Sequence, residues 1–167
     1  MGLGRLLDFG MLATELSALF ARDLTRLSQQ IEAFPDTPSL WATSPGVTNG
    51  AGTLALHLEG NLREYVGRQL GAIPHRRDRP LEFSARGTDQ RELLGRLGDL
   101  HEMVPQVIGA LSPATLDARY PEDALGHPMS TRQFLIHLSG HLNYHLGQID
   151  YLRRITTGQG ALRLAAF

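Results

Sequence analysis

The sequence predicts an all-α fold in which four helices form a bundle, within one domain spanning residues 1–167. Apolar residues recur at steps of three and four along four long stretches, and none of these stretches shows the period-two alternation of a strand. Segments rich in proline and glycine separate the four stretches. A chain of this length can bury one full core. Amphipathic helices joined in this way bury their apolar faces against one another.

The first two helices are expected over residues 4–32 and 49–70. Between them, residues 34–47 hold three prolines and predict a loop, in which Trp41 is expected to anchor the loop or to line a pocket. Thr48 or Asn49 is expected to cap the second helix. The apolar face of the first helix consists of Leu6, Phe9, Ala13, Leu16, Phe20, Leu24, Leu27 and Ile31.

A charged connection over residues 73–87, which contains the run HRRDR, is expected to lead into the third helix. Thr88 is the expected cap of that helix, and Pro105 should kink or interrupt it because proline lacks the N–H that the helix requires. Ser112 followed by Pro113 then predicts a short helical turn.

The fourth helix has the clearest boundaries in the sequence. Ser130 and Gln133 have the spacing of a capping box, which predicts the start of a helix. The apolar periodicity continues to about Thr157, and Gly158 is expected to end the helix as its C-terminal glycine.

The composition excludes several classes of function. The chain has no cysteine, which rules out disulfides, thiolate metal sites and iron–sulfur clusters, and no lysine, which rules out Schiff-base chemistry. The net charge of -1 predicts no nucleic-acid partner, and the run HRRDR is expected to be a solvated loop. No apolar run approaches the ~20 residues of a bilayer span. The expected protein is cytoplasmic, with no membrane partner.

Histidines on two of the predicted helices indicate a metal site. His141 and His145 are four residues apart, so they lie one above the other on one helix face, and both are expected to replace apolar residues in the core seam. His57 occupies an apolar stripe of the second helix and is the expected third ligand. Three neutral histidines with open positions are typical of a catalytic metal site. The alternative is that all three are ordinary core residues with hydrogen-bond partners.

Two segments, TLALHLEGNLREYV (53–66) and HLSGHLNYHLGQIDYLRR (137–154), resemble the motif helices of the DinB-like superfamily. The resemblance implies a metal-binding four-helix bundle, often a homodimer, related to mycothiol- and bacillithiol-dependent transferases. It also implies that the metal ligands are His57, His141 and His145, and that His137 matches a frequent histidine that is not usually a ligand. The name of the family implies no binding to DNA.

The sequence departs from the family pattern directly after the two ligands of the fourth helix. Members often have glutamate and arginine at these positions, whereas this chain has Leu142 and Leu146. The three expected ligands are unaffected by this difference. It does weaken the transfer of any particular activity.

The resemblance favours a metal-dependent thiol S-transferase that acts on a small molecule, with Zn or Ni as the metal and a low-molecular-weight thiol as a second cofactor. A dication held by neutral ligands can lower the pKa of an incoming thiol. Asn61 and Gln148 are expected to support the ligands by hydrogen bonds, and Tyr65 and Tyr144 are candidates to line a pocket.

Two alternatives stay open: a metal-dependent small-molecule hydrolase, and a non-catalytic, metal-stabilised binding or stress protein. No carboxylate is expected beside the histidines to act as a general base, because Glu59 and Glu64 point away from the His57 face. This expectation favours thiol chemistry over hydrolysis. The sequence leaves the substrate and the identity of the metal open.

Overall fold

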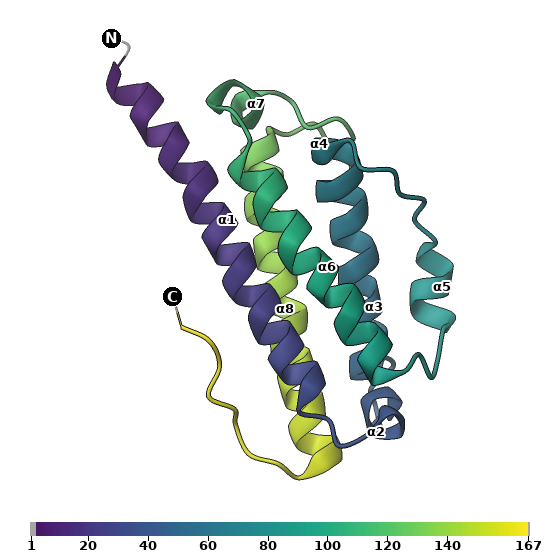
Figure 1. The fold of residues 1–167 in the computed structure, drawn as a ribbon. Coiled ribbons are helices and arrows are strands. Elements are labelled where there is room, and N and C mark those ends of the chain that lie inside the picture. The colour runs from purple at the N-terminus through teal and green to yellow at the C-terminus, as the bar shows by residue number, and fades with distance from the viewer. Residues whose placement is uncertain (1–2, 167) are drawn as a thin grey trace.

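A computed structural model describes residues 3–166, with side chains from residue 11 onward. Three single long helices stand beside a continuous helical column that contains a π-helical turn (Figure 1). The long helices are α1 (Leu3–Glu32), α6 (Gln90–Gly109) and α8 (Thr131–Thr157), and the column consists of α3 (Ala51–Leu62), η1 (Arg63–Arg68) and α4 (Gln69–Gly71). The described residues form no strand beyond one isolated bridge between Arg119 and Ser130. The prediction of an all-α fold is confirmed.

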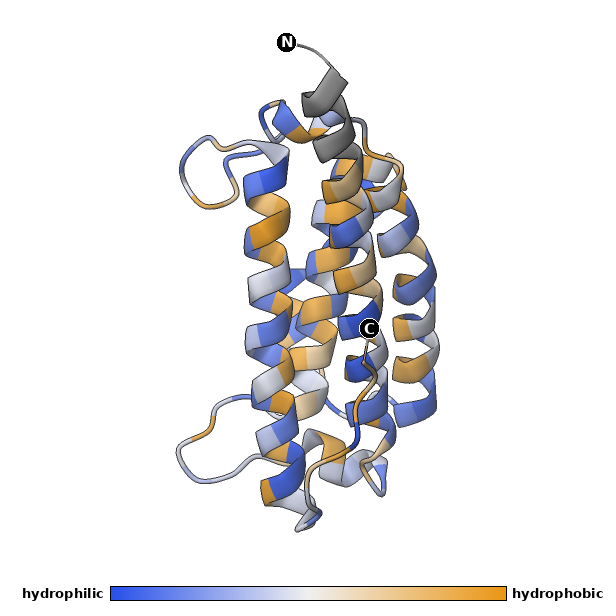
Figure 2. Cartoon of the chain, turned by 90° about the vertical axis from the view of Figure 1, so that its left-hand side faces the viewer, coloured by the Kyte–Doolittle hydropathy of each residue, from blue (hydrophilic) through white to orange (hydrophobic). Residues whose placement is uncertain are grey.

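The long elements pack as a bundle, with α1 against α6 and α8, and α3 against the same two helices. Buried apolar side chains from all four fill the space between them, and each helix in Figure 2 carries its hydrophobic residues in bands separated by hydrophilic ones. The predicted face of α1 is buried from Ala13 to Ile31, whereas Leu6 and Phe9 lie outside the described side chains. None of the described helices is both long and apolar enough to cross a bilayer.

Three short helices accompany the four long elements: α2 (Thr37–Trp41), α5 (Arg79–Ser84) and α7 (Pro113–Asp117). The turn after Ser112 was expected, but α2 and α5 lie in segments that the sequence analysis predicted to be loops. Asp36 and Asp78 cap these two helices, and each has a proline in the first turn. Proline costs no hydrogen bond there because the first N–H groups of a helix have no partner within it. The prolines therefore begin helices that they were expected to exclude.

Two other expected helix starts are wrong by one or two residues. The second helix is capped by Gly50, which makes no side-chain cap hydrogen bond, rather than by Thr48 or Asn49. The third is capped by Asp89, whose carboxylate accepts a hydrogen bond from the Arg91 N–H at 2.9 Å, rather than by Thr88.

Of the two effects expected of Pro105 on the third helix, a kink or an interruption, the interruption is wrong, because α6 continues past it to Gly109. The Ser17 hydroxyl donates a hydrogen bond to the Pro105 carbonyl at 2.8 Å, which links α1 to this point of α6. The fourth helix is as predicted. It begins at the Ser130–Gln133 capping box and ends at Gly158, whose φ of 70° is left-handed.

Candidate metal centre

Three histidines from two helices, His57 on α3 and His141 and His145 on α8, meet where α3 packs against α8. The Nε2 atom of His141 lies 3.3 Å from that of His57 and 3.1 Å from that of His145. We call these residues the histidine cluster. The predicted site residues are thus brought together, although one lies more than eighty positions from the other two in the sequence.

The spacing of these nitrogens suits a single ion. All three candidate ligand atoms lie within 4.8 Å of one another. Ligands at ~2.0–2.1 Å from a tetrahedral zinc ion lie about 3.3–3.4 Å apart, close to the two nitrogen–nitrogen distances given above. The histidine cluster can therefore hold a divalent metal ion without rearrangement of either helix.

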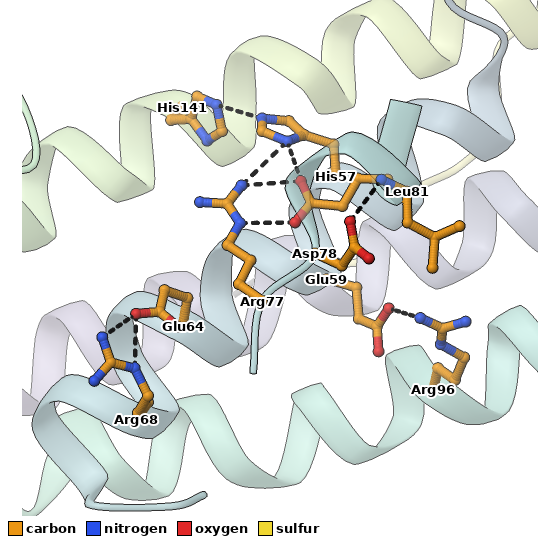
Figure 3. A network of polar contacts seen from close by, with 10 residues as sticks. His57, Glu59, Glu64, Arg68, Arg77, Asp78, Leu81, Arg96 and His141 are labelled. Atoms are coloured by element: carbon orange, nitrogen blue, oxygen red, sulfur yellow. Dashed lines mark hydrogen bonds and ion pairs between the residues drawn. The ribbon is translucent and has the colours of Figure 1, made fainter. Parts of the chain in front are cut away.

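An ionic chain fixes the ring of His57. Its Nδ1 lies 2.9 Å from Oε2 of Glu82 on α5, and Arg77 donates two hydrogen bonds to the Glu82 carboxylate, at 2.7 and 2.9 Å. Because the nearer partner of Nδ1 is a carboxylate, this nitrogen carries the proton and Nε2 keeps the lone pair that a metal needs. Figure 3 shows Arg77 beside His57, with His141 on the far side of the ring.

The Glu82 carboxylate is ionised despite its position. The residue is only 7% exposed, and burial alone would raise its pKa. The hydrogen bonds from His57 and Arg77 outweigh burial and hold the pKa of Glu82 below its usual value. His57 is therefore supported by an anion whose own charge is balanced by Arg77.

Gly60 on α3 makes room for this carboxylate. A Cβ atom at this position would lie 2.8 Å from the Cδ atom of Glu82, closer than two such carbons can approach. The glycine thus lets α5 bring Glu82 against α3, one turn of helix after His57.

The two histidines of α8 have weaker support. The Nδ1 atom of His145 donates to the side-chain oxygen of Gln148 at 2.7 Å, which again leaves Nε2 free, so the predicted role of Gln148 matches the contact in the structure. The buried Nδ1 of His141 has no hydrogen-bond partner among the described residues.

Both α8 rings are held in the neutral form. Burial, followed by repulsion from the neighbouring histidines, lowers the pKa of His141 to about 4. Burial also lowers the pKa of His145, against the opposing effect of its bond to Gln148. Neutral rings keep their lone pairs available at neutral pH.

The position of His141 and His145 within the bundle differs from the prediction. Leu142 and Leu146 occupy the buried seam, while the two histidines are only partly buried at its edge. The rest of the predicted stripe is buried, at Phe134, Leu138, Ile149 and Leu152, so the difference is confined to the two histidines, and the histidine cluster is open to solvent on one side. His137, expected not to be a ligand, is exposed and outside the cluster.

Trp41 anchors the segment before α3. Its ring N–H donates to the Thr88 carbonyl at 3.0 Å, and its ring lies so close to Gly52 that a Cβ there would be 2.8 Å from it. Of the two roles expected for Trp41, the structure shows the anchoring one.

Glu82 and Arg77 were missed by the sequence analysis, which placed both in a solvated loop and expected no carboxylate near the histidines. A signal was present: Asp78, Pro80 and Glu82 have the spacing of a helix start with an acidic first turn. The expectation for Glu59 and Glu64 was right. They form ion pairs with arginines away from the histidine cluster, as Figure 3 shows for Glu59 with Arg96 and Glu64 with Arg68.

Two cavities flank the histidine cluster along the α3–α8 groove. The first, which we call the cationic pocket, has a volume of about 320 Å³ and is bordered by His57, His141, Asn61, Tyr65 and two arginines. The second, the apolar pocket, has a volume of about 480 Å³ and is bordered by His145, Gln148 and aliphatic and tyrosine side chains, Tyr144 among them. The candidate metal position thus opens toward two chemically different spaces.

Comparison with known proteins identifies relatives by family and by fold. The sequence profile of the DinB superfamily matches residues 19–149. The crystal structure of a DinB-like protein from Bacillus cereus superposes with a TM-score of 0.65 at 17% sequence identity, covering 84% of this chain and 91% of that one. That structure supports the fold alone. No curated protein matches the chain.

Proposed function

The chain belongs to the DinB superfamily, and on that premise we propose that it is a metal-dependent enzyme that transfers a low-molecular-weight thiol to a small electrophile. The proposed metal ligands are the Nε2 atoms of His57, His141 and His145, and the proposed metal is Zn or Ni. The observation that carries the proposal is the convergence of three imidazole nitrogens, with the opposite ring nitrogens of His57 and His145 donating to protein acceptors.

The chemistry of this donor set suits activation of a thiol. A divalent cation held by three uncharged ligands keeps its full charge and lowers the pKa of a thiol that coordinates it. The protein itself has no cysteine, so the thiol must come from a small molecule. Glu82 and Arg77 hold His57 in place, and the partial exposure of His141 and His145 leaves room for a substrate to approach.

The hydrogen bonds that occupy the Glu82 carboxylate favour thiol transfer over hydrolysis. A general base near the metal would assist a hydrolase by deprotonating the attacking water. Both oxygens of Glu82 are occupied by His57 and Arg77, and Glu59 is held by Arg63 and Arg96. A thiol requires less help, because its unperturbed pKa is far below that of water. A non-catalytic, metal-stabilised protein stays the alternative if no turnover is found.

The first test is metal content by elemental mass spectrometry on tag-free protein. We expect about one metal ion per wild-type chain and loss of the metal in His141→Ala. His137→Ala is the matched control, since this exposed histidine on the same helix lies outside the histidine cluster. Absence of metal in the wild type after incubation with zinc and nickel salts would overturn the proposal.

The second test is turnover of the electrophile 1-chloro-2,4-dinitrobenzene by the zinc-loaded protein. We expect product only when a thiol is added, and none with His141→Ala. Hydrolysis of a nitrophenyl ester without thiol would favour the hydrolase instead. Metal binding that raises the melting temperature with neither activity would favour the non-catalytic role.

A further inference from the structure

The cationic pocket has an excess of positive charge, because Glu82 balances Arg77 whereas no carboxylate of the described residues balances Arg79. Among the described residues, its lining includes Arg77 and Arg79 together with three histidines, but no aspartate or glutamate. A metal ion in the histidine cluster would add two further positive charges at one wall. The electrostatic potential of this cavity therefore favours an anionic occupant.

Arg79 is the free cation of this pocket. Its guanidinium lies over the Phe83 ring, 5.2 Å from the ring centre, and no carboxylate in the described part of the chain pairs with it. Arg77, by contrast, uses Nε and Nη2 to bind Glu82, which leaves Nη1 without a described partner. Two arginines can thus present unpaired N–H donors toward one ligand, and such donors bind carboxylates in preference to neutral groups.

Asn61 provides the second, independent observation. It lies one helical turn after His57, is only 7% exposed, and borders the same pocket. Its side-chain oxygen is buried without a hydrogen-bond partner among the described residues. A buried polar atom left unpaired is costly, so this acceptor is suited to an N–H or O–H group of a ligand.

Tyr65, which borders the pocket from the π-helical turn, is packed under the Arg77 guanidinium at 5.4 Å from the ring centre. π-Helical turns are rare and occur frequently at functional sites. The opposite side of the histidine cluster offers no such donors, because the lining of the apolar pocket includes no arginine.

We propose that the cationic pocket is the subsite for the thiol, and that it selects thiols with a carboxylate and an adjacent N–H donor. Arg79 and Nη1 of Arg77 would bind the carboxylate, and the Asn61 oxygen would accept the N–H hydrogen bond. The electrophile then enters from the apolar pocket, where Val47, Leu54 and Ile155 favour an uncharged partner. This assignment rests on the proposed function. It extends that function by assigning the thiol to the cationic pocket and the electrophile to the apolar pocket.

Binding is measured by isothermal titration calorimetry on the zinc-loaded protein with four probes. N-acetylcysteine carries all three recognised groups; its methyl ester lacks the charge, 3-mercaptopropionate lacks the N–H, and N-acetylserine lacks the thiol. We expect N-acetylcysteine to bind more tightly than each of the others. Arg79→Gln should weaken the binding of N-acetylcysteine about fivefold and leave the affinity for the methyl ester unchanged, because only the acid presents a charge to that side chain.

The control for Arg79→Gln is Arg76→Gln, since Arg76 is an exposed neighbour that does not border the cationic pocket. It should leave all four affinities unchanged. Asn61→Leu should abolish the preference for N-acetylcysteine over 3-mercaptopropionate and should not lower the melting temperature, because it removes an unpaired buried oxygen.

The outcomes separate the two proposals. Equal binding of the acid and the ester in the wild type, or an equal loss of both in Arg79→Gln, would overturn the subsite while leaving thiol transfer intact. Equal binding of N-acetylcysteine and N-acetylserine, with both weakened by Arg79→Gln, would support the subsite and contradict the role of the thiol. Protein that takes up no metal can still be tested with N-acetylserine, whose affinity should depend on Arg79.

Discussion

The two helices that supply the histidine cluster support their ligands in different ways. On α3, His57 is held by Glu82, a buried anion from a separate helix that is itself held by Arg77. On α8, the Nδ1 atom of His145 is held by the neutral side-chain amide of Gln148, three residues further along the same helix. The Nδ1 atom of His141 has no partner among the described residues. Charged, buried hydrogen bonds are roughly twice as strong as neutral ones. The α3 side should therefore determine the rigidity and the affinity of the site.

The largest effect should follow from removal of the anion. We expect Glu82→Gln to lower zinc affinity by about tenfold to a hundredfold, because the partners behind metal-bound histidines commonly contribute that much. Competition with a chromophoric chelator gives the affinity. Glu59→Gln is the matched control: it neutralises another buried carboxylate of the same region that pairs with Arg63 and Arg96 and does not touch the histidine cluster. An equal loss in both variants would show that general destabilisation, rather than support of His57, is responsible.

A smaller effect should follow from displacing the anion without removing it. In Gly60→Ala the added methyl group collides with Glu82, so we expect zinc affinity to fall by about tenfold. Alanine is the better helix former by ~1 kcal/mol, which works against a loss of stability. Gly98→Ala on α6 is the control, since a Cβ there meets nothing within 4 Å. Unchanged affinity in Gly60→Ala would mean that α5 can move without consequence for His57.

Gln148→Leu should lower zinc affinity less than either Glu82→Gln or Gly60→Ala. The lost bond is neutral and partly exposed, and water can replace the amide, so we expect zinc affinity to fall by about threefold. The same chelator competition measures it. A loss as large as that of Glu82→Gln would remove the difference between the two helices.

The smallest effect concerns the metal-free protein at acid pH. Burial lowers the pKa of His141 to about 4 in the folded chain, against 6.5 for an ordinary exposed histidine. Between these two values the unfolded chain binds a proton that the folded chain does not, so the free energy of unfolding falls as the pH falls. The melting temperature should be constant above pH 7 and decrease from pH 6.5 toward pH 4. His141→Gln should reduce this slope; an identical slope in the variant would assign it to other groups.

The difference between the helices also marks what the sequence could and could not predict. His141, His145 and Gln148 share one helix, so their spacing of three and four residues was sufficient to group them. His57 was found because it interrupts an apolar stripe. Glu82 lies 25 positions from His57 in a segment whose composition indicates a loop, and no periodicity connects the two.

The partial exposure of His141 and His145 has a similar explanation. In the middle of α8, a stripe through the two histidines and a stripe through Leu142 and Leu146 both have helical spacing, so periodicity alone could not choose between them. Burial decides in favour of leucine, because an imidazole in the seam would need polar partners that an apolar core does not offer. The fold class and the three candidate ligands were predictable, whereas the support and the exposure of the site required the tertiary structure.

The order of these residues along the chain means that one backbone cut can separate His57 and its supports from the two histidines of α8. The residues that position His57, which are Gly60, Arg77 and Glu82, all precede Gly87, an exposed loop residue with a φ of 79°. His141, His145 and Gln148 all follow it. A backbone cut at this turn would separate the ligands into one fragment with a single histidine and another with two. Neither fragment alone holds the full donor set, so tight metal uptake by a mixture would report that the two halves had reassembled.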